Sequence, residues 1–107
     1  MGNLLEMLGF IRVKNITGTG DNPCKCCDSW IEHWIKHTKK SPTCCYACKE
    51  KKTYLVGGHV HKVSNIDQRW YIVPLCDSCN KKKESFGFYV LESDLVAARA
   101  CEKDDSY

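Results

Sequence analysis

Nine cysteines and four histidines are the side chains of this 107-residue chain best suited to chemistry, and several are spaced as metal ligands. Two Cys-x2-Cys pairs, Cys45 with Cys48 and Cys76 with Cys79, stand 27 residues apart. Each such turn points two sulfurs at one ion, and two turns complete a tetrahedral site with no position left for water. The spacing leaves open tetrathiolate iron as the metal and Cys44 in place of Cys45 as a ligand. We predict a closed, structural zinc site whose binding energy contributes to folding.

A second group of cysteines comes just before a segment that carries two histidines one helical turn apart, His33 and His37. Our preferred ligand set is Cys24, Cys27, His33 and the isolated Cys101, which would clip the C-terminal segment to the N-terminal knuckle. The alternative is that both histidines line one helix face beside neighbouring tryptophans, with the cysteines facing solvent. We predict two structural zinc ions in all.

Composition and cysteine number narrow the class of protein. An odd count of thiols, and a start without a basic region and long apolar stretch, argue against a secreted disulfide framework, so we expect a cytoplasmic protein. No apolar run is long enough to cross a membrane. With 43% hydrophobic and 27% charged residues, the length predicts a single compact domain over residues 1–107.

The elements that must position these ligands can be read from local patterns. Ser29 and Glu32 form a capping box that predicts a helix through about His37. In segment 59–63, alternation puts His59 and His61 on one face of a strand and the intervening residues on the other. A turn or short helix is expected after Cys79, and Ser93 as the cap of a last helix that runs toward Cys101. The other expected strands are 53–56, 70–73 and 88–91, with Gly57-Gly58 as a turn.

The middle of the chain resembles the HNH family, in the stretches Gly57-Gly58-His59-Val60 and Ile72-Val73-Pro74-Leu75-Cys76-Asp77-Ser78-Cys79-Asn80. The resemblance covers about residues 44–83 and implies a treble-clef, ββα-metal arrangement. A wider likeness is to small bacterial and phage proteins with Ser-Trp-x2-His-Trp ahead of Gly-Gly-His-Val and Tyr-Ile-Val-Pro-Leu-Cys. The predicted fold is therefore a small α+β, zinc-stabilised treble clef, with a zinc-clipped knuckle and helix at about 24–38 and a strand and helix at about 88–101.

The HNH resemblance also implies catalytic roles for particular residues, and this sequence departs from the family pattern at two positions. By resemblance, His59 would be the general base and Asn80 a ligand of a catalytic Mg, Mn or Ni ion, needed only if the protein is an active nuclease. The family often has a metal-binding Asp before that histidine, where this chain has Gly58, and its middle Asn falls near Trp70 or Tyr71. His61 could substitute from the same strand face. We therefore predict a binding module without catalysis, with an endonuclease that cuts phosphodiester bonds as the alternative.

Basic residues are concentrated in the same region. Residues 36–83 hold eleven Lys or Arg against three Asp or Glu, although the whole chain is only +3. Such a surface could bind DNA or RNA through phosphates, with exposed aromatic side chains for stacking. The alternatives are a solvated lysine surface and a protein partner that contacts Trp30 and Trp34. The predicted phosphate-binding residues are Lys51, Lys52, Arg69, Lys81, Lys82 and Lys83.

Overall fold

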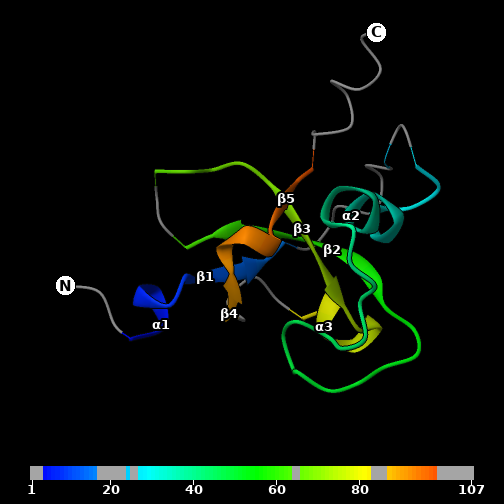
Figure 1. Cartoon of the computed structure of the whole chain (residues 1–107), viewed down its shortest axis with the longest axis horizontal. Helices are drawn as coiled ribbons and strands as arrows, with labels where there is room; N and C mark the ends of the chain where they lie inside the picture. The colour runs from blue at the N-terminus through cyan, green and yellow to red at the C-terminus, as the bar shows by residue number, and fades with distance from the viewer. Residues whose placement is uncertain (1–3, 17–23, 25–26, 64–65, 83–86, 99–107) are drawn as a thin grey trace, which may run out of the picture.

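A five-stranded antiparallel sheet in the order β4-β1-β2-β3-β5 organises the protein (Figure 1). The computed structural model describes residues 4–16, 24, 27–63, 66–82 and 87–98. The strands are β1 (Phe10–Asn15), β2 (Val56–Lys62), β3 (Tyr71–Leu75), β4 (Gly87–Leu91) and β5 (Val96–Ala97), and the helices are α1 (Leu4–Met7), α2 (Trp30–Thr38), α3 (Asp77–Asn80) and the 3-10 helix η1 (Glu92–Asp94). The predicted α+β class is confirmed. None of the helices in these ranges combines the length and apolar composition needed to cross a bilayer.

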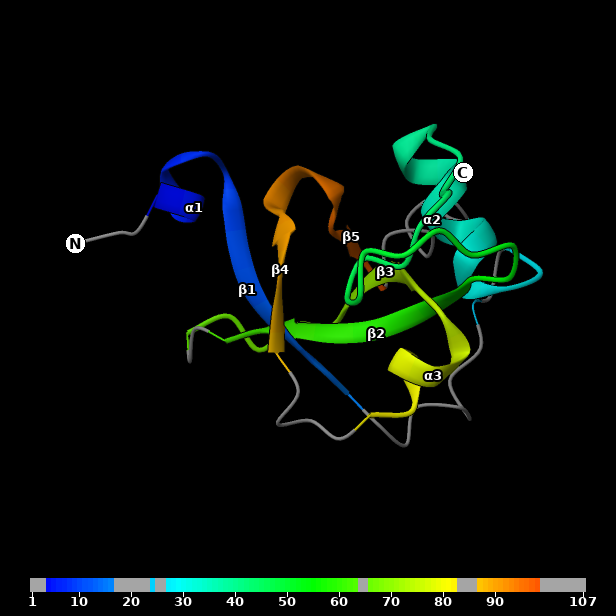
Figure 2. The same ribbon diagram turned by 90° about the horizontal axis from the view of Figure 1, so that it is seen from below.

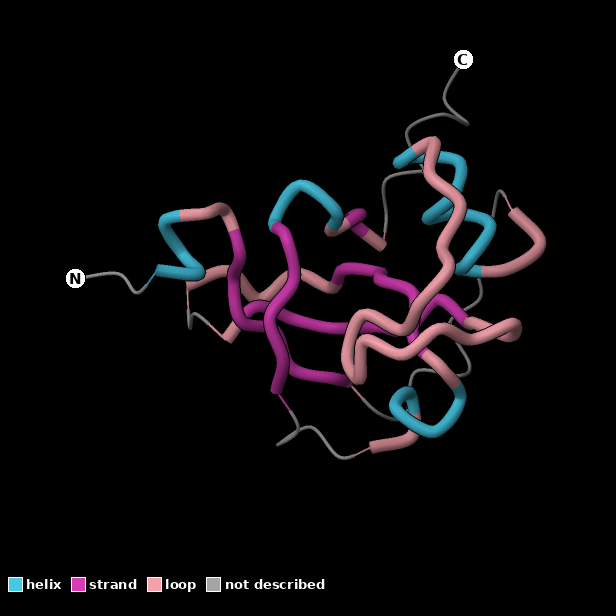
Figure 3. Tube along the Cα trace, turned by 60° about the horizontal axis from the view of Figure 1, so that its bottom comes forward, coloured by secondary structure: helices cyan, strands magenta, loops and turns pink. Residues whose placement is uncertain are grey.

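The two faces of the sheet bury different clusters. Val13, Val60 and Val73 are fully buried on the face that also meets the cysteines of α3. On the other face, Ile72 packs beneath Trp34 of α2. Figure 2 shows α2 and α3 on opposite sides of β2, and Figure 3 shows β1 and β4 turned steeply against β2 and β3, so the sheet is strongly coiled. This separation of faces decides which functional side chains can meet.

Helix α2 begins where the capping box predicts. The Ser29 hydroxyl accepts a hydrogen bond from the backbone N–H of Glu32 at 3.2 Å. The helix ends because Lys39 adopts a left-handed conformation, with φ 63°, that closes the last turn. The cap therefore fixes the rotation of the helix and turns His33 and Trp34 to the sheet, where both are buried.

A buried carboxylate joins α2 to the segment after β4. Asp94 is 4% exposed, and its carboxylate accepts hydrogen bonds from Lys40 Nζ at 2.6 Å and from the Tyr46 hydroxyl at 3.1 Å. Its backbone carbonyl accepts the indole N–H of Trp34 at 2.8 Å. The prediction of a helix that begins at Ser93 is therefore wrong within the described residues, where a single 3-10 turn and the short β5 take its place. The tertiary contacts of Asp94 override the local capping signal.

Gly57-Gly58, expected to form a turn, lies inside β2. Gly57 pairs with Pro74 and Gly58 with Val73. A Cβ on Gly57 would lie 2.5 Å from the backbone carbonyl carbon of Trp30, so only glycine lets α2 approach the strand this closely. The turn prediction is wrong because these glycines serve close packing. Strand β2 therefore starts at Val56, and most of the predicted strand 53–56 is irregular.

Candidate metal centre

Two segments distant in sequence bring four cysteine sulfurs together. The ligand atoms of Cys45, Cys48, Cys76 and Cys79 all lie within 4.8 Å of one another, a set that could hold a metal ion. Cys45 and Cys48 come from the segment between α2 and β2, residues 44–51, which is called the knuckle from here on. The others come from α3, where Cys76 is the N-cap and Cys79 lies in the helix. Figure 1 shows the knuckle segment lying beside α3.

The knuckle is held in place by backbone hydrogen bonds. The N–H of Cys45 donates to the carbonyl of Glu50 at 3.0 Å, and the N–H of Tyr46 donates to the carbonyl of Pro74 at 2.9 Å. Lys49 adopts a left-handed conformation, with φ 68°, that reverses the chain. This geometry distinguishes the two adjacent thiols, because Cys45 joins the sulfur cluster and Cys44 forms a bridge with Lys51 outside it.

The electrostatics of this cluster suit a cation. Burial raises the pKa of Cys45, but hydrogen bonds from the backbone N–H groups of Cys48, Cys76 and Ala47 outweigh it and lower that pKa to about 7. Burial and the sulfurs of Cys76 and Cys45 raise the pKa of Cys79 to about 12. Four adjacent thiols cannot all ionise without a compensating charge, and a divalent ion bound between them supplies it. The donor set therefore fits zinc, although the sulfurs alone do not identify the metal.

A second cluster forms at the start of α2. The ligand atoms of Cys24, Cys27 and His33 also lie within 4.8 Å of one another, with Cys24 Sγ 3.6 Å from His33 Nδ1. These are three of the four residues predicted for the second site. The fourth, Cys101, lies outside the described residues. The structure thus offers a Cys2His set that could hold a metal ion.

The orientation of His33 matches that of a metal ligand. Its Nε2 lies 2.9 Å from the carbonyl oxygen of Ala97, which can only accept, so Nε2 carries the proton and Nδ1 presents its lone pair to the two sulfurs. The ring is fully buried, and Trp30 meets it edge-on with ring centroids 5.0 Å apart. His37, the other histidine of this helix, instead places Nδ1 2.9 Å from the carbonyl oxygen of His33.

His59 and Asn80, the catalytic candidates, lie toward opposite faces of the sheet. A Cβ on Gly58 would lie 2.9 Å from the Asn80 amide oxygen, so position 58 faces α3, and by strand alternation His59 faces α2. The His59 ring is 4% exposed, between Trp30 and Trp70 at centroid distances of 5.0 and 5.5 Å. Burial and the nearby His33 lower the pKa of His59 to about 4.

The side chain of His61 shares the His59 face, as alternation predicts, but lies farther from α2. Its Nδ1 is 3.1 Å from the carbonyl oxygen of Lys62, and the ring is half-buried. The structure therefore brings neither histidine to Asn80.

Three of the six predicted phosphate-binding residues have carboxylate partners. Lys52 pairs with Glu50 at 3.3 Å, Lys81 with Asp77 at 3.0 Å, and Arg69 with Asp67 at 3.1 Å. Lys51 and Lys82 are exposed, and Lys83 lies outside the described residues. Pairing leaves this set with less free positive charge than its sequence suggests.

Two supporting groups were missed from the sequence. The Ala97 carbonyl oxygen that orients His33 is backbone, so no residue type marks it. Asn15 is fully buried, and its side-chain amide donates to the carbonyls of Asn80 at 3.0 Å and Lys82 at 2.6 Å. The alternation of Ile11, Val13 and Asn15 with basic residues could have identified this strand.

No protein-family model, curated protein or solved structure matches the chain. The HNH resemblance is therefore carried by its motif residues alone. The fold and the two clusters define a small α+β protein with two sites that could hold metal ions.

Proposed function

We propose that this chain is a zinc-binding module of HNH descent that binds nucleic acid without cutting it. The observation that carries the proposal is the meeting of four thiol sulfurs, from the knuckle and α3, within 4.8 Å of one another. A tetrathiolate set leaves a bound zinc ion no open position for water or substrate. The first zinc is therefore structural, and the second, at Cys24, Cys27 and His33, ties the start of α2 to the same body.

The arrangement around the first site supports a treble clef. A knuckle supplies Cys45 and Cys48, the β2–β3 hairpin follows, and α3 supplies the other two thiols at its start. This order of elements is the one that the HNH resemblance implies. In a chain of this size the metal contributes much of the folding free energy.

Three features favour binding over catalysis. His59 is buried between two tryptophans, Asn80 faces the other side of β2, and Gly58 has no side chain that could ligate a catalytic ion. A general base must reach the proton that it abstracts, directly or through one water. His59 in this position would have to leave its pocket before it could act on a phosphodiester.

Nucleic acid is a better-supported partner than protein. The protein-partner hypothesis placed the contact at Trp30 and Trp34, but Trp34 is 1% exposed and Trp30 packs against Gly57 and His59. These indoles are used in packing. The excess of basic side chains between residues 36 and 83 supports an anionic partner.

Plasmid nicking and oligonucleotide binding, measured on the same zinc-loaded protein, test the proposal. We expect salt-dependent binding and no nicking of supercoiled DNA with added Mg²⁺, Mn²⁺ or Ni²⁺. Nicking that His59→Ala abolishes would establish the endonuclease alternative. Failure to bind any nucleic acid would refute the proposed function.

A further inference from the structure

One half of the sheet presents a face that no described helix covers. Helix α2 packs on β2, β3 and β5, and Figure 2 shows β1 and β4 lying away from it. Strand β1 turns Val13 and Asn15 inward, so Arg12 and Lys14 point outward. Strand β4 likewise buries Phe88 and turns Tyr89 outward.

The strand register gathers the outward side chains into one surface. Lys14 pairs with His61, and Arg12 pairs with Tyr89. Trp70 is 40% exposed and lies on the same face, because its ring contacts His59. The outer sheet face, as we define it, consists of Arg12, Lys14, His61, Trp70 and Tyr89.

The charge of the outer sheet face is positive and uncompensated. The outward positions of β1, β2 and β4 hold no Asp or Glu. Within the described residues, Arg12 and Lys14 form no ion pair, unlike Lys52, Arg69 and Lys81. A polyanion can therefore approach both charges without displacing a carboxylate.

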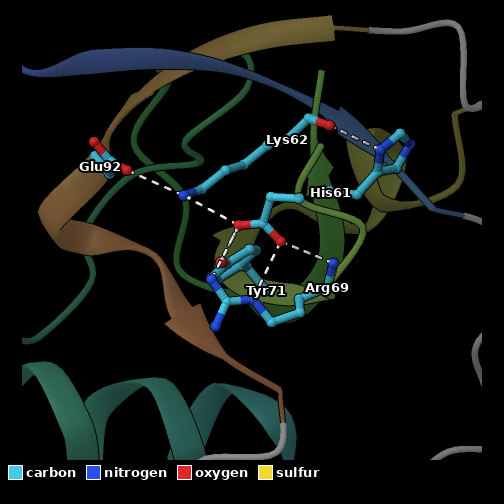
Figure 4. A network of polar contacts seen from close by, with 6 residues as sticks. His61, Lys62, Arg69, Tyr71 and Glu92 are labelled. Atoms are coloured by element: carbon cyan, nitrogen blue, oxygen red, sulfur yellow. Dashed lines mark hydrogen bonds and ion pairs between the residues drawn. The ribbon is translucent and has the colours of Figure 1, made fainter. Parts of the chain in front are cut away.

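Two acidic side chains pair with Lys62, whose position on β2 faces the other side of the sheet. Lys62 Nζ lies 3.3 Å from Asp67 and 3.0 Å from Glu92, and the Tyr71 hydroxyl donates to Asp67 at 2.6 Å. Figure 4 shows His61 and Lys62 leaving β2 in opposite directions, with the imidazole away from this network. The carboxylates thus neutralise the inner side of the strand and leave the outer side basic.

We propose that the outer sheet face binds single-stranded RNA. Arg12 and Lys14 contact phosphates, and the rings of Trp70 and Tyr89 stack on unpaired bases, which a duplex would keep inside its stack. The proposal rests on the proposed nucleic-acid function and names its surface and its ligand class.

His61 is the residue that selects RNA over DNA. Its Nδ1 lies 3.1 Å from the carbonyl of Lys62, which can only accept, so Nδ1 is the protonated nitrogen and Nε2 of the neutral ring is an acceptor. The ribose 2′-hydroxyl can donate to that nitrogen, whereas the DNA backbone has no hydrogen-bond donor.

Fluorescence anisotropy with labelled, unstructured RNA of about 12 nucleotides tests the proposal on the full, zinc-loaded chain. Arg12→Gln with Lys14→Gln should lower the slope of log K against log salt by about 1.4, since each phosphate contact on a single strand contributes about 0.7. Tyr89→Val, which keeps a strand-forming residue, should weaken binding about tenfold through lost stacking. His61→Phe should remove the preference for RNA over single-stranded DNA of the same sequence.

The control variant is Lys51→Gln with Lys52→Gln, which removes the same charge from the knuckle. We expect it to leave RNA affinity within about twofold of wild type, because neither lysine belongs to the outer sheet face and Lys52 already pairs with Glu50. Zinc content and near-UV circular dichroism confirm that each variant is folded.

Several results would overturn the inference, and they separate it from the proposed function. Affinity lost in the knuckle variant but kept in the Arg12/Lys14 variant would assign the binding surface to the knuckle. That result would refute the outer sheet face as the RNA-binding surface, and the proposed nucleic-acid function would stand. Equal affinity for RNA and single-stranded DNA would refute the RNA assignment, as would preferred binding of duplex DNA. Folded, zinc-loaded protein that binds none of these probes would refute both proposals.

Discussion

The pair of adjacent thiols, Cys44 and Cys45, offers the sharpest test of the first metal site. The sulfur of Cys45 lies in the four-cysteine cluster, whereas Cys44 lies outside it although it is the next residue. Cys45→Ser removes one ligand of a closed site, and Cys44→Ser makes the same chemical change one residue away. The two variants therefore make the same chemical change inside and outside the four-cysteine cluster.

The expected effect of Cys45→Ser is large. A structural zinc site contributes on the order of 10 kcal/mol at neutral pH. A domain of this size has a total stability of about 5–15 kcal/mol. If most of the free energy contributed by metal binding is lost, Cys45→Ser should be unfolded or free of zinc at the first site. Cys44→Ser should change the free energy of unfolding by less than about 1 kcal/mol, because its half-buried thiol is replaced by a group of similar size.

The assay is zinc per chain together with near-UV circular dichroism. Trp34 and Tyr46 lie edge to face at 5.7 Å between ring centroids, so their signal reports whether α2 and the knuckle remain packed. We expect wild-type zinc and spectrum for Cys44→Ser and loss of both for Cys45→Ser. A folded Cys45→Ser protein with undiminished zinc would refute the ligand assignment, and zinc lost only from Cys44→Ser would show that the knuckle register is wrong.

Three further predictions concern α2 and β2. His33→Ala should lower bound zinc toward one ion per chain, and unchanged stoichiometry would remove His33 from the ligands. Gly57→Ala should destabilise the protein by about 1–3 kcal/mol in urea unfolding, because the new methyl group meets the backbone of Trp30; an unchanged midpoint would contradict that close approach. His59 has a pKa near 4 in the folded state against about 6.5 when unfolded, so folding favours the neutral ring. The contribution of His59 to the free energy of unfolding is constant above pH 6.5 and falls by about 1.4 kcal/mol per pH unit between pH 6.5 and about 4. The free energy of unfolding should therefore fall more steeply from pH 7 to pH 5 in wild type than in His59→Phe. Equal slopes would show that His59 is not buried in its neutral form.

Sequence reasoning succeeded where local chemistry decides the structure. The cap at Ser29 and the alternation around His59 depend on neighbours within a few residues, and both appear in the structure. The cysteine spacing likewise identifies groups that the fold brings together. It could not separate Cys44 from Cys45, because that choice depends on the left-handed Lys49 and on hydrogen bonds to a distant strand.

Sequence reasoning failed where contacts between residues far apart in the sequence determine the local structure. Gly57-Gly58 carries the signal of a turn, but the approach of α2 places it within a strand. Ser93 carries the signal of a helix cap, but the partners of Asp94 allow only one 3-10 turn. The relation of His59 to Asn80 depends on which face each one occupies, and the HNH motif specifies types and spacing without specifying the face.

The strand order has a consequence for the timing of folding during synthesis. Strand β1 leaves the ribosome first, but its two neighbours, β2 and β4, are made later, and β4 ends only at Leu91. The four cysteines of the first cluster have all been made once Asn80 has emerged, while β1 still has one unpaired edge. Strand β1, the first of the five to be made, thus keeps one unpaired edge, exposed to aggregation, until β4 arrives.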